Sequence, residues 1–387
     1  MKRKAIAILL LPILILMLVI SPIFLFRIGS IRADRIGHLA LDLEICLCLH
    51  DRRKKILPRH INIFYSISPI SNQYLLNLWS SKIKILPRQL LEPLDIAIKK
   101  IKLFRRLNYF HFISLNGHSD LTILDHTLPR LTIPNDHEIF GEDLLEKLGI
   151  SKGQKYVCLA VRDGKYLREF LPEKDWSYHD FRDTDIQDYL DMAEYLTEKG
   201  LVVVRMGKEM QHKFDTKNPM IIDYANSNLR SDFADVYLFA NCFFCISTST
   251  GMDALASIFR RPIGLVNVVN IKSVAKGNII KLFQPKSFFD VDLGRNLNYN
   301  EIMKRSFFSI SESSQLSNSN IVLQDNTQEE LKLFAGDFLD VISEVSINQF
   351  KVKDSSFNFH ESSEGRIVKI SKSWLNLHSN YLNANSQ

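Results

Sequence analysis

Short, wholly apolar runs alternate with amphipathic stretches along most of the 387-residue chain. A short apolar run predicts a buried strand, whereas an apolar residue at every third or fourth position predicts a helix. In the first half, the predicted strands are residues 24–30, 60–67, 84–87 and 111–115. The predicted helices are residues 37–52, 73–82, 91–107 and 141–150. Strands separated by helices indicate a parallel sheet with covered faces.

A second and clearer series begins at residue 155. Its predicted strands are residues 155–163, 201–207, 220–224, 243–247 and 263–267. Its predicted helices are residues 186–200, 231–242 and 251–261. Fully apolar short strands are typical of the centre of a parallel sheet. The fold class is therefore α/β, with two Rossmann-like, doubly wound domains that face a cleft.

The same pattern sets the domain boundaries. Residues 148–154, LGISKGQ, have the composition of a linker. We predict a first domain over residues 22–150 and a second over residues 151–346. After Ser346 the chain becomes rich in Ser and Asn, so residues 347–387 are expected to form a loosely ordered polar tail.

A basic start, MKRK, precedes an apolar run from Ala5 to about Phe26. Because about 20 apolar residues can span a bilayer, a signal anchor is one interpretation. A cleaved signal peptide is another, but no small-residue cleavage site follows the run. In the third interpretation, which we favour, the strand at 24–30 already belongs to the globular body. Residues 1–21, interrupted by Pro12, then form a monotopic or re-entrant hydrophobic membrane anchor.

The net charge of +6 is unevenly distributed, with the basic excess between Arg52 and Arg106. A basic first half, including the basic amphipathic helix predicted at 91–107, fits an anionic acceptor or an anionic lipid surface. Nucleic acid is not an expected partner, because neither a recognition helix nor zinc-finger spacing is visible. The five cysteines are odd in number and sit mostly in apolar runs. They indicate small buried side chains in a reducing compartment.

Polar residues follow the predicted strands of the second series, and doubly wound sheets bind their ligands at that edge. The strand FFCIS is followed by the turn STSTG, which opens a helix whose first amides can bind an anion. In the alternative, Ser249 or Thr250 only caps this helix. Neither a Walker loop nor GxGxxG occurs, which disfavours a dinucleotide. The candidate donor-binding residues are Arg162, Arg205, Gly207, Ser247, Thr248, Ser249, Gly251 and Asn267.

The matching stretch of the first series is IGSIRADRIGHLALDLE, residues 28–44, which follows the first strand and opens a helix. His38 would lie at the helix start and act as a general base on a hydroxyl, or would only be satisfied there by the backbone. Asp34 is a rival base. Gly37 would let the backbone approach a ligand, and Arg35 could hold an anionic acceptor.

Residues 176–189, WSYHDFRDTDIQDY, form a polar insertion dense in aromatic side chains. The pattern DxD, which holds a divalent ion in one class of sugar transferases, occurs here at 183–185 and again at 290–292. Because Thr184 and Asp185 directly precede a helix, capping is the favoured role and no metal site is predicted. The candidates for acceptor or loop contacts are Tyr178, His179 and Arg182, beside Arg35 and Gly37.

Three segments carry a resemblance to a known family: RIGHLALDLE (35–44), YHDFRDTDIQDYLDMAEYLTEKGLVVVRMG (178–207) and SDFADVYLFANCFFCISTSTGMDALASIFRRPIGLVN (231–267). They resemble a bacterial family of glycosyltransferases found in surface-glycan gene clusters. More broadly, residues 25–345 resemble the GT-B superfamily. RIGHL and FRDTDI are fairly specific for the family, whereas STSTG is shared more loosely across the superfamily.

The resemblance implies a GT-B-like enzyme with its nucleotide-sugar donor on the second domain and its acceptor on the first. The sugar would pass to a hydroxyl of a surface glycan or lipid-linked acceptor without a metal or other cofactor. By position, Gly37 and His38 match the loop near the acceptor, and Arg205 with residues 247–251 matches the donor-phosphate region. The protein would be associated with the cytoplasmic face of the bacterial inner membrane. A nucleotide-sugar epimerase of the same fold and a non-catalytic membrane-bound partner in glycan assembly stay open as alternatives.

Overall fold

The structure is a computed structural model in which the chain divides into two compact units. Unit 1 holds the residues up to His118 and His126–Thr132, and unit 2 holds Ser119–Asp125 and Ile133–Gln387. The boundary therefore lies near residue 132 and not at the predicted residue 150. The predicted cleft between the units stays a prediction. The described residues are 11–53, 59–100, 121–170, 173, 175–208, 210–274, 279–317, 319–347 and 370–382.

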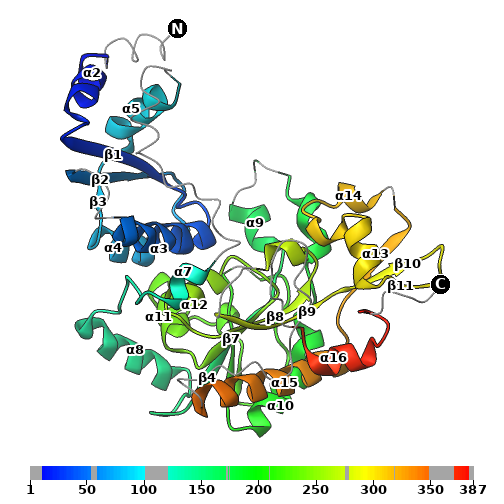
Figure 1. Ribbon diagram of the computed structural model, residues 1–387. Coiled ribbons are helices and arrows are strands. Elements are labelled where there is room, and N and C mark those ends of the chain that lie inside the picture. The colour runs from blue at the N-terminus through cyan, green and yellow to red at the C-terminus, as the bar shows by residue number, and fades with distance from the viewer. Residues whose placement is uncertain are drawn as a thin grey trace. The chain divides into compact units, whose positions relative to one another are not determined.

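Unit 1 contains a three-stranded parallel sheet in the order β1-β2-β3. Its strands are β1 (Phe24–Ile31), β2 (Arg59–Ser66) and β3 (Lys84–Ile85). Its helices are α2 (Leu11–Ile20), α3 (Ile36–Arg53), α4 (Gln73–Ser80) and α5 (Arg88–Lys100). In Figure 1, α2 and α5 lie on one face of this sheet and α3 and α4 on the other. These elements confirm the predicted pattern, and the strand predicted at 111–115 lies outside the described residues.

Unit 2 is built on a six-stranded parallel sheet in the order β6-β5-β4-β7-β8-β9. The chain leaves β4 outward through β5 to β6, then returns to the other side of β4 and continues through β7 to β9. This is the Rossmann strand order. The doubly wound prediction is thus confirmed for unit 2. In unit 1, the described strands follow one another in chain order, so that sheet is wound in one direction only. The strands are β4 (Tyr156–Ala160), β5 (Val202–Arg205), β6 (Ile221–Ile222), β7 (Phe244–Ser247), β8 (Ile263–Val268) and β9 (Ile280–Pro285).

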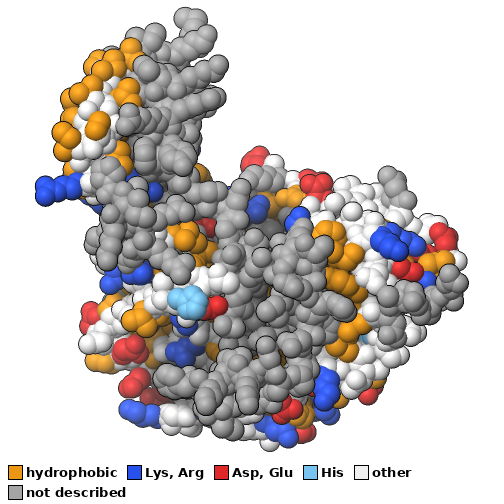
Figure 2. Space-filling view, viewed as in Figure 1, with side chains coloured by type: hydrophobic (Ala, Val, Ile, Leu, Met, Phe, Trp, Pro, Cys, Tyr) orange, Lys and Arg blue, Asp and Glu red, His pale blue; other side chains and the backbone are white. Residues whose placement is uncertain are grey.

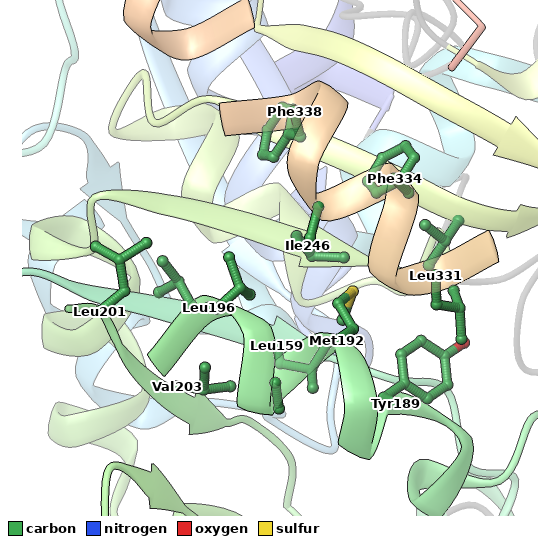
Figure 3. Packing of buried hydrophobic residues seen from close by; sticks show 14 of the residues in the cluster. Leu159, Tyr189, Met192, Leu196, Leu201, Val203, Ile246, Leu331, Phe334 and Phe338 are labelled. Atoms are coloured by element: carbon green, nitrogen blue, oxygen red, sulfur yellow. The ribbon is translucent and has the colours of Figure 1, made fainter. Parts of the chain in front are cut away.

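The main core of unit 2 lies between one face of this sheet and two helices, α10 (Leu190–Glu198) and α15 (Gln328–Ile347). Figure 3 shows Leu159 and Ile246 of the sheet facing Phe334 and Phe338 of α15. Alternate residues point to the other face, where the Tyr156 hydroxyl donates to a main-chain carbonyl of α11 (Asp232–Asn241) at 2.9 Å. The sheet is therefore covered on both sides, as its apolar strands predict.

The remaining elements of unit 2 surround this three-layer body. The helices are α7 (Thr122–Asp125), α8 (Asn135–Lys147), α9 (Lys165–Phe170), α12 (Asp253–Ile258), α13 (Tyr299–Lys304), α14 (Ser314–Ser317) and α16 (Lys372–Leu377). The 3-10 turns are η3 (Ser177–Arg182), η4 (Ile186–Tyr189), η5 (Tyr224–Asn226), η6 (Ile271–Ser273) and η7 (Phe307–Ser309). A second, antiparallel sheet contains β10 (Ser287–Asp290), β11 (Arg295–Asn296) and β12 (Ile321–Gln324).

Two helix predictions differ from the structure. Helix α8 begins at Asn135, six residues before the predicted start, and Pro134 precedes it. Proline fixes the backbone just ahead of a helix but gives no apolar periodicity, so the pattern missed this turn. The helix predicted at 251–261 is the short α12, which covers six residues.

The prediction of a loosely ordered tail is wrong for residues 370–382. Ile370 forms a parallel bridge to Phe283 of β9, and the Ser371 hydroxyl donates to Asp337 of α15 at 2.7 Å. Trp374 of α16 is buried. Polar composition misled the prediction, because a few buried anchors hold this segment. Residues 348–369 of the predicted tail lie outside the described residues.

Two further expectations concern the membrane and the cysteines. Searching the described residues finds no helix that is both long and apolar enough to cross a bilayer. The ten N-terminal residues of the predicted anchor lie outside that part of the chain.

All five cysteines are free and buried, which confirms their interpretation as small core side chains. Burial raises the pKa of the Cys46 thiol to about 12, so this thiol stays protonated at neutral pH.

Candidate functional site

The winding of the unit 2 sheet reverses between β4 and β7. Ala160, the last residue of β4, is the register partner of Ser247, the last residue of β7. Ligands of doubly wound sheets bind at this switch point, beyond the carboxyl ends of the strands. The two loops are joined, because the Arg162 N–H donates to the Thr248 hydroxyl at 2.8 Å and the Thr248 N–H to the Ala160 carbonyl at 3.1 Å. These loops define the candidate site.

The loop after β7 presents backbone amides at this edge. Ser249 has a φ of 59°, a left-handed conformation that non-glycine residues seldom adopt. Such strained backbone is typical of functional turns. The Thr250 N–H donates to the Ser247 hydroxyl at 3.2 Å, and the Met252 N–H to the Thr250 hydroxyl at 3.2 Å. Within the described part of the chain, the N–H groups of Ser249 and Gly251 donate no hydrogen bond. They are therefore available to bind an anion.

Two arginines converge on this turn. Arg162 donates from Nε to an Asp183 oxygen at 2.9 Å, and Arg182 donates to the Ser249 carbonyl. Burial, and then the neighbouring charge of Arg162, lower the pKa of Arg182 to about 10, although Asp253 acts in the opposite direction. The Arg182 cation is therefore held in an unfavourable, incompletely neutralised state. A bound anion would relieve that strain.

Residues 177–189, here called the edge segment, cross the carboxyl edge of the sheet. The segment contacts the loops after β4 and β7 through Arg162 and Ser249. It accepts hydrogen bonds from residues at the ends of β8 and β9, from Asn267 at 2.8 Å and from Lys286 at 3.1 Å. The motif FRDTDI lies in this segment. The position of the segment over the site accounts for the polar residues of the motif, whereas a helix or strand pattern does not.

Gly164 allows the loop after β4 to approach the edge segment. A β-carbon at this position would collide with the Asp183 carboxylate and the Arg168 guanidinium. Burial raises the pKa of Asp183, and the ion pair with Arg162 only partly opposes that effect. Asp183 thus holds Arg162 in place, and its charge also favours the Arg182 cation.

Arg205 ends β5, as the sequence predicts, but its guanidinium is already paired within the protein. Its side chain is only 2% exposed. Its guanidinium donates to the Asp223 carboxylate at 3.1 Å and to the His212 carbonyl at 2.7 Å. Because Arg205 ends a strand, it was predicted to bind a ligand. Its side chain instead lies inside the fold and forms an ion pair with Asp223. A phosphate could reach it only if this pair opened.

Four other predicted donor residues have structural partners. Asn267 and Asn326 exchange hydrogen bonds of 2.9 and 2.6 Å between side-chain oxygens and main-chain N–H groups. Gly207 is buried, and a β-carbon there would meet the Met210 side chain. Ser247 and Thr248 are buried as well, and the Ser247 hydroxyl donates to Asp253 at 2.9 Å. Their hydroxyls shape the turn, which leaves Ser249 and Thr250 partly exposed and Gly251 exposed.

Unit 1 has its own polar site at the start of α3. His38 is partly exposed, and its Nδ1 lies 3.0 Å from an oxygen of the buried Asp42. A carboxylate only accepts hydrogen bonds, so this contact suits an Nδ1–H donor. The sequence analysis missed Asp42, although its i,i+4 spacing on a helix was a usable signal. One oxygen of Asp34 is buried with no hydrogen-bond partner among the described residues.

The contacts of three other predicted acceptor residues, Gly37, Arg35 and Tyr178, are within the protein. Gly37 is the second residue of α3, and the Arg35 carbonyl accepts the Leu39 N–H at 2.9 Å. The Tyr178 ring stacks on Trp176 with centroids 6.1 Å apart. The side chain of His179 lies outside the described part of the chain.

The DxD pattern at 183–185 does not form an ion site. Asp183 pairs with Arg162, and Asp185 caps η4 by accepting the Gln187 N–H at 2.9 Å, which confirms the capping interpretation. In the second DxD, at 290–292, Asp290 accepts from Arg305 at 2.7 Å. Across the residues that the structure describes, no cluster of three or more His, Cys, Asp and Glu side chains could hold a metal ion.

No family model matches this chain, and no curated protein matches it. Among solved structures, ADP-heptose LPS heptosyltransferase II of E. coli has a TM-score of 0.42 at 12% identity, over 83% of this chain and 99% of that one. The iron-containing dodecameric glycosyltransferase TibC of enterotoxigenic E. coli has a TM-score of 0.43 at 11% identity, over 85% and 80%.

A family 9 glycosyl transferase of Veillonella parvula has a TM-score of 0.36 at 12% identity, over 62% of this chain and 80% of that one. These three structures are glycosyltransferases by name. At TM-scores below 0.5 these likenesses carry no argument about the activity of this chain, which has to be argued from its own residues.

Proposed function

We propose that the protein is a glycosyltransferase and that unit 2 binds the diphosphate of its nucleotide-sugar donor between the ends of β4 and β7. One observation carries this proposal: Arg162 and Arg182 converge with the open amides of Ser249 and Gly251 on the switch point of a Rossmann-type sheet. Guanidinium groups and free amides bind phosphate oxygens through charge-assisted hydrogen bonds. The RIGHL and FRDTDI resemblance supports sugar transfer over other uses of a nucleotide.

The same groups would assist the chemical step. In the transfer, the acceptor hydroxyl oxygen forms a bond to the anomeric carbon, and the bond from that carbon to the diphosphate oxygen breaks. Negative charge grows on the departing diphosphate. Fixed cations and amides at that position stabilise the charge without reorganising. We therefore propose a reaction that needs neither a metal ion nor a further cofactor.

His38 is the proposed base of an inverting reaction. Its Nε2 would take the proton of the acceptor hydroxyl while Asp42 holds the proton on Nδ1. Asp42 therefore acts as a positioning residue, and Asp34 stays the rival base. Unit 1 would accordingly receive the acceptor, and unit 2 the donor, in a GT-B arrangement.

The acceptor and the location complete the proposal. The acceptor would be a hydroxyl of a surface glycan or of a lipid-linked glycan, and the transferred group a hexosyl or related sugar. The place would be the cytoplasmic face of the bacterial inner membrane. The basic residues between Arg52 and Arg106 and the apolar N-terminal segment support an acceptor at an anionic lipid surface.

Replacing Asp42 with asparagine should lower the transfer rate by roughly 10²- to 10⁴-fold, because an amide can donate to Nδ1 and move the proton to Nε2. Donor binding should not change, since unit 2 is untouched. Initial rates and donor affinity measured on the same preparations check both statements. If Asp34→Asn abolishes transfer while Asp42→Asn does not, Asp34 is the base.

Thermal-shift screening with UDP-, GDP-, CMP- and dTDP-sugars tests the proposed function. We expect one diphosphate sugar to raise the unfolding temperature more than the CMP-sugar, which carries a single phosphate. Stabilisation by no nucleotide would favour a non-catalytic partner in glycan assembly. Isomerised sugar formed from the donor alone, with no acceptor present, would identify an epimerase instead.

A further inference from the structure

Helix α2 is wholly apolar and is held along one side. Leu14 and Met17 are buried in a cluster with Ile28 of β1 and Leu91 of α5, and Leu18 packs against the same cluster. This packing fixes the helix against the sheet of unit 1. The opposite side of the helix therefore has a defined orientation, away from the unit.

That opposite side carries an exposed apolar patch. Val19 and Ile23 are the most exposed members, at 68% and 77%. Figure 2 shows orange side chains gathered on this part of unit 1. Such contiguous apolar surface is uncommon on a soluble protein unless it binds something. The patch consists of Leu11, Ile13, Ile15, Leu16, Val19, Ile23 and Phe26.

The charge around the patch indicates what covers it. The chain has no acidic residue before Asp34, whereas Lys2, Arg3 and Lys4 precede α2 in sequence. Arg59 is exposed and is the register partner of Phe24, at the end of β1 nearest the patch. The exposed apolar surface, the exposed Arg59 and the basic residues in the preceding sequence match acyl chains beneath anionic headgroups. A second copy of the chain would bring like charges together, which disfavours self-association through this patch.

We propose that this patch docks unit 1 onto a membrane that contains anionic lipid, with α2 lying in the membrane plane. The helix remains packed on β1 and α5 throughout, so docking needs neither a spanning helix nor the opening of the buried cluster. This mode differs from a re-entrant anchor, in which α2 would leave the body. It uses the apolar residues of α2 that the structure describes at the membrane surface.

Vesicle co-sedimentation of the full chain tests the proposal. We expect binding to phosphatidylcholine vesicles that contain phosphatidylglycerol, and weaker binding to phosphatidylcholine alone or at high salt. The double variant Leu16→Glu/Val19→Glu should lower the partition coefficient by about tenfold or more, because two charges would enter the interface. The matched control is Ile139→Glu, whose side chain is 72% exposed on α8 of unit 2 and should change nothing.

Four readouts decide the outcome: circular dichroism, donor affinity, vesicle binding and oligomeric state. Unchanged circular dichroism and donor affinity in the double variant show that its loss of binding is a loss of docking, independent of the proposed transfer reaction. Equal binding by the wild type and the double variant would overturn the proposal. So would a dimer in lipid-free buffer that the double variant dissociates, because the occupant would then be a second copy of the chain.

Discussion

Replacing Arg182 with alanine is expected to weaken the binding of a nucleoside diphosphate by about 10- to 100-fold, the range of one charged hydrogen bond. Arg182 is a partly buried cation whose pKa is lowered by burial and by the neighbouring charge of Arg162, so a bound anion would gain from it. Its contact within the protein is the Ser249 carbonyl, which can turn to water when the side chain is removed. Isothermal titration calorimetry with the diphosphate found by screening measures the change.

Arg295→Ala is the matched control for this experiment. Arg295 is 43% exposed, pairs with Glu301 and belongs to the small antiparallel sheet, so its removal should leave the affinity unchanged. Arg182→Lys should recover only part of the affinity, because lysine keeps the charge but loses the planar donor fork. Equal affinities of Arg182→Ala and the wild type would remove Arg182 from the site.

Replacing Arg205 with alanine should act on stability, at a cost of about 3 kcal/mol, because it breaks a buried ion pair and leaves a cavity. The remaining Asp223 keeps hydrogen bonds from the Phe214 N–H at 2.9 Å and the Asn226 amide at 2.7 Å. These partners hold the expected loss near the lower end of the range for buried pairs. The midpoint and slope of urea unfolding give the free energy of unfolding.

The same Arg295→Ala variant serves as the control for stability, since an exposed ion pair contributes at most about 1 kcal/mol. Where the Arg205→Ala protein is still folded, its affinity for the diphosphate should stay near that of the wild type. A stable Arg205→Ala protein that no longer binds the diphosphate would return Arg205 to the phosphate site.

The elements of the fold could be predicted because burial leaves a periodic trace in the sequence. The strands at 243–247 and 263–267 are apolar throughout, and they emerge as β7 and β8. The pattern missed the start of α8, which follows a proline, and the C-terminal α16, which a few buried residues such as Trp374 hold in place. Strand order is a matter of long-range pairing, so no local pattern in the chain shows that β4 and β7 are neighbours.

The site could be placed along the chain but not assigned side chain by side chain. The turn after β7 and the loop after β4 were identified, because parallel strands bring their carboxyl ends together. From the sequence, Arg205 was predicted for the donor and Arg182 for acceptor or loop contacts, whereas we propose Arg182 for the donor phosphate. The direction of a side chain at a strand end depends on the loops that pack on it. Here Arg205 forms an ion pair with Asp223 inside the fold, and Arg182, which belongs to the edge segment, donates to the Ser249 carbonyl.

The central claim is that a diphosphate binds between β4 and β7, and a crystal structure of the full chain with its nucleoside diphosphate tests it most directly. We expect phosphate oxygens within about 3 Å of the Arg182 guanidinium and of the Ser249 and Gly251 N–H groups, the ordinary hydrogen-bond distance. The Arg205–Asp223 pair should stay closed. Phosphates bound elsewhere on unit 2, or held by Arg205 after that pair has opened, would show that the site is wrongly assigned.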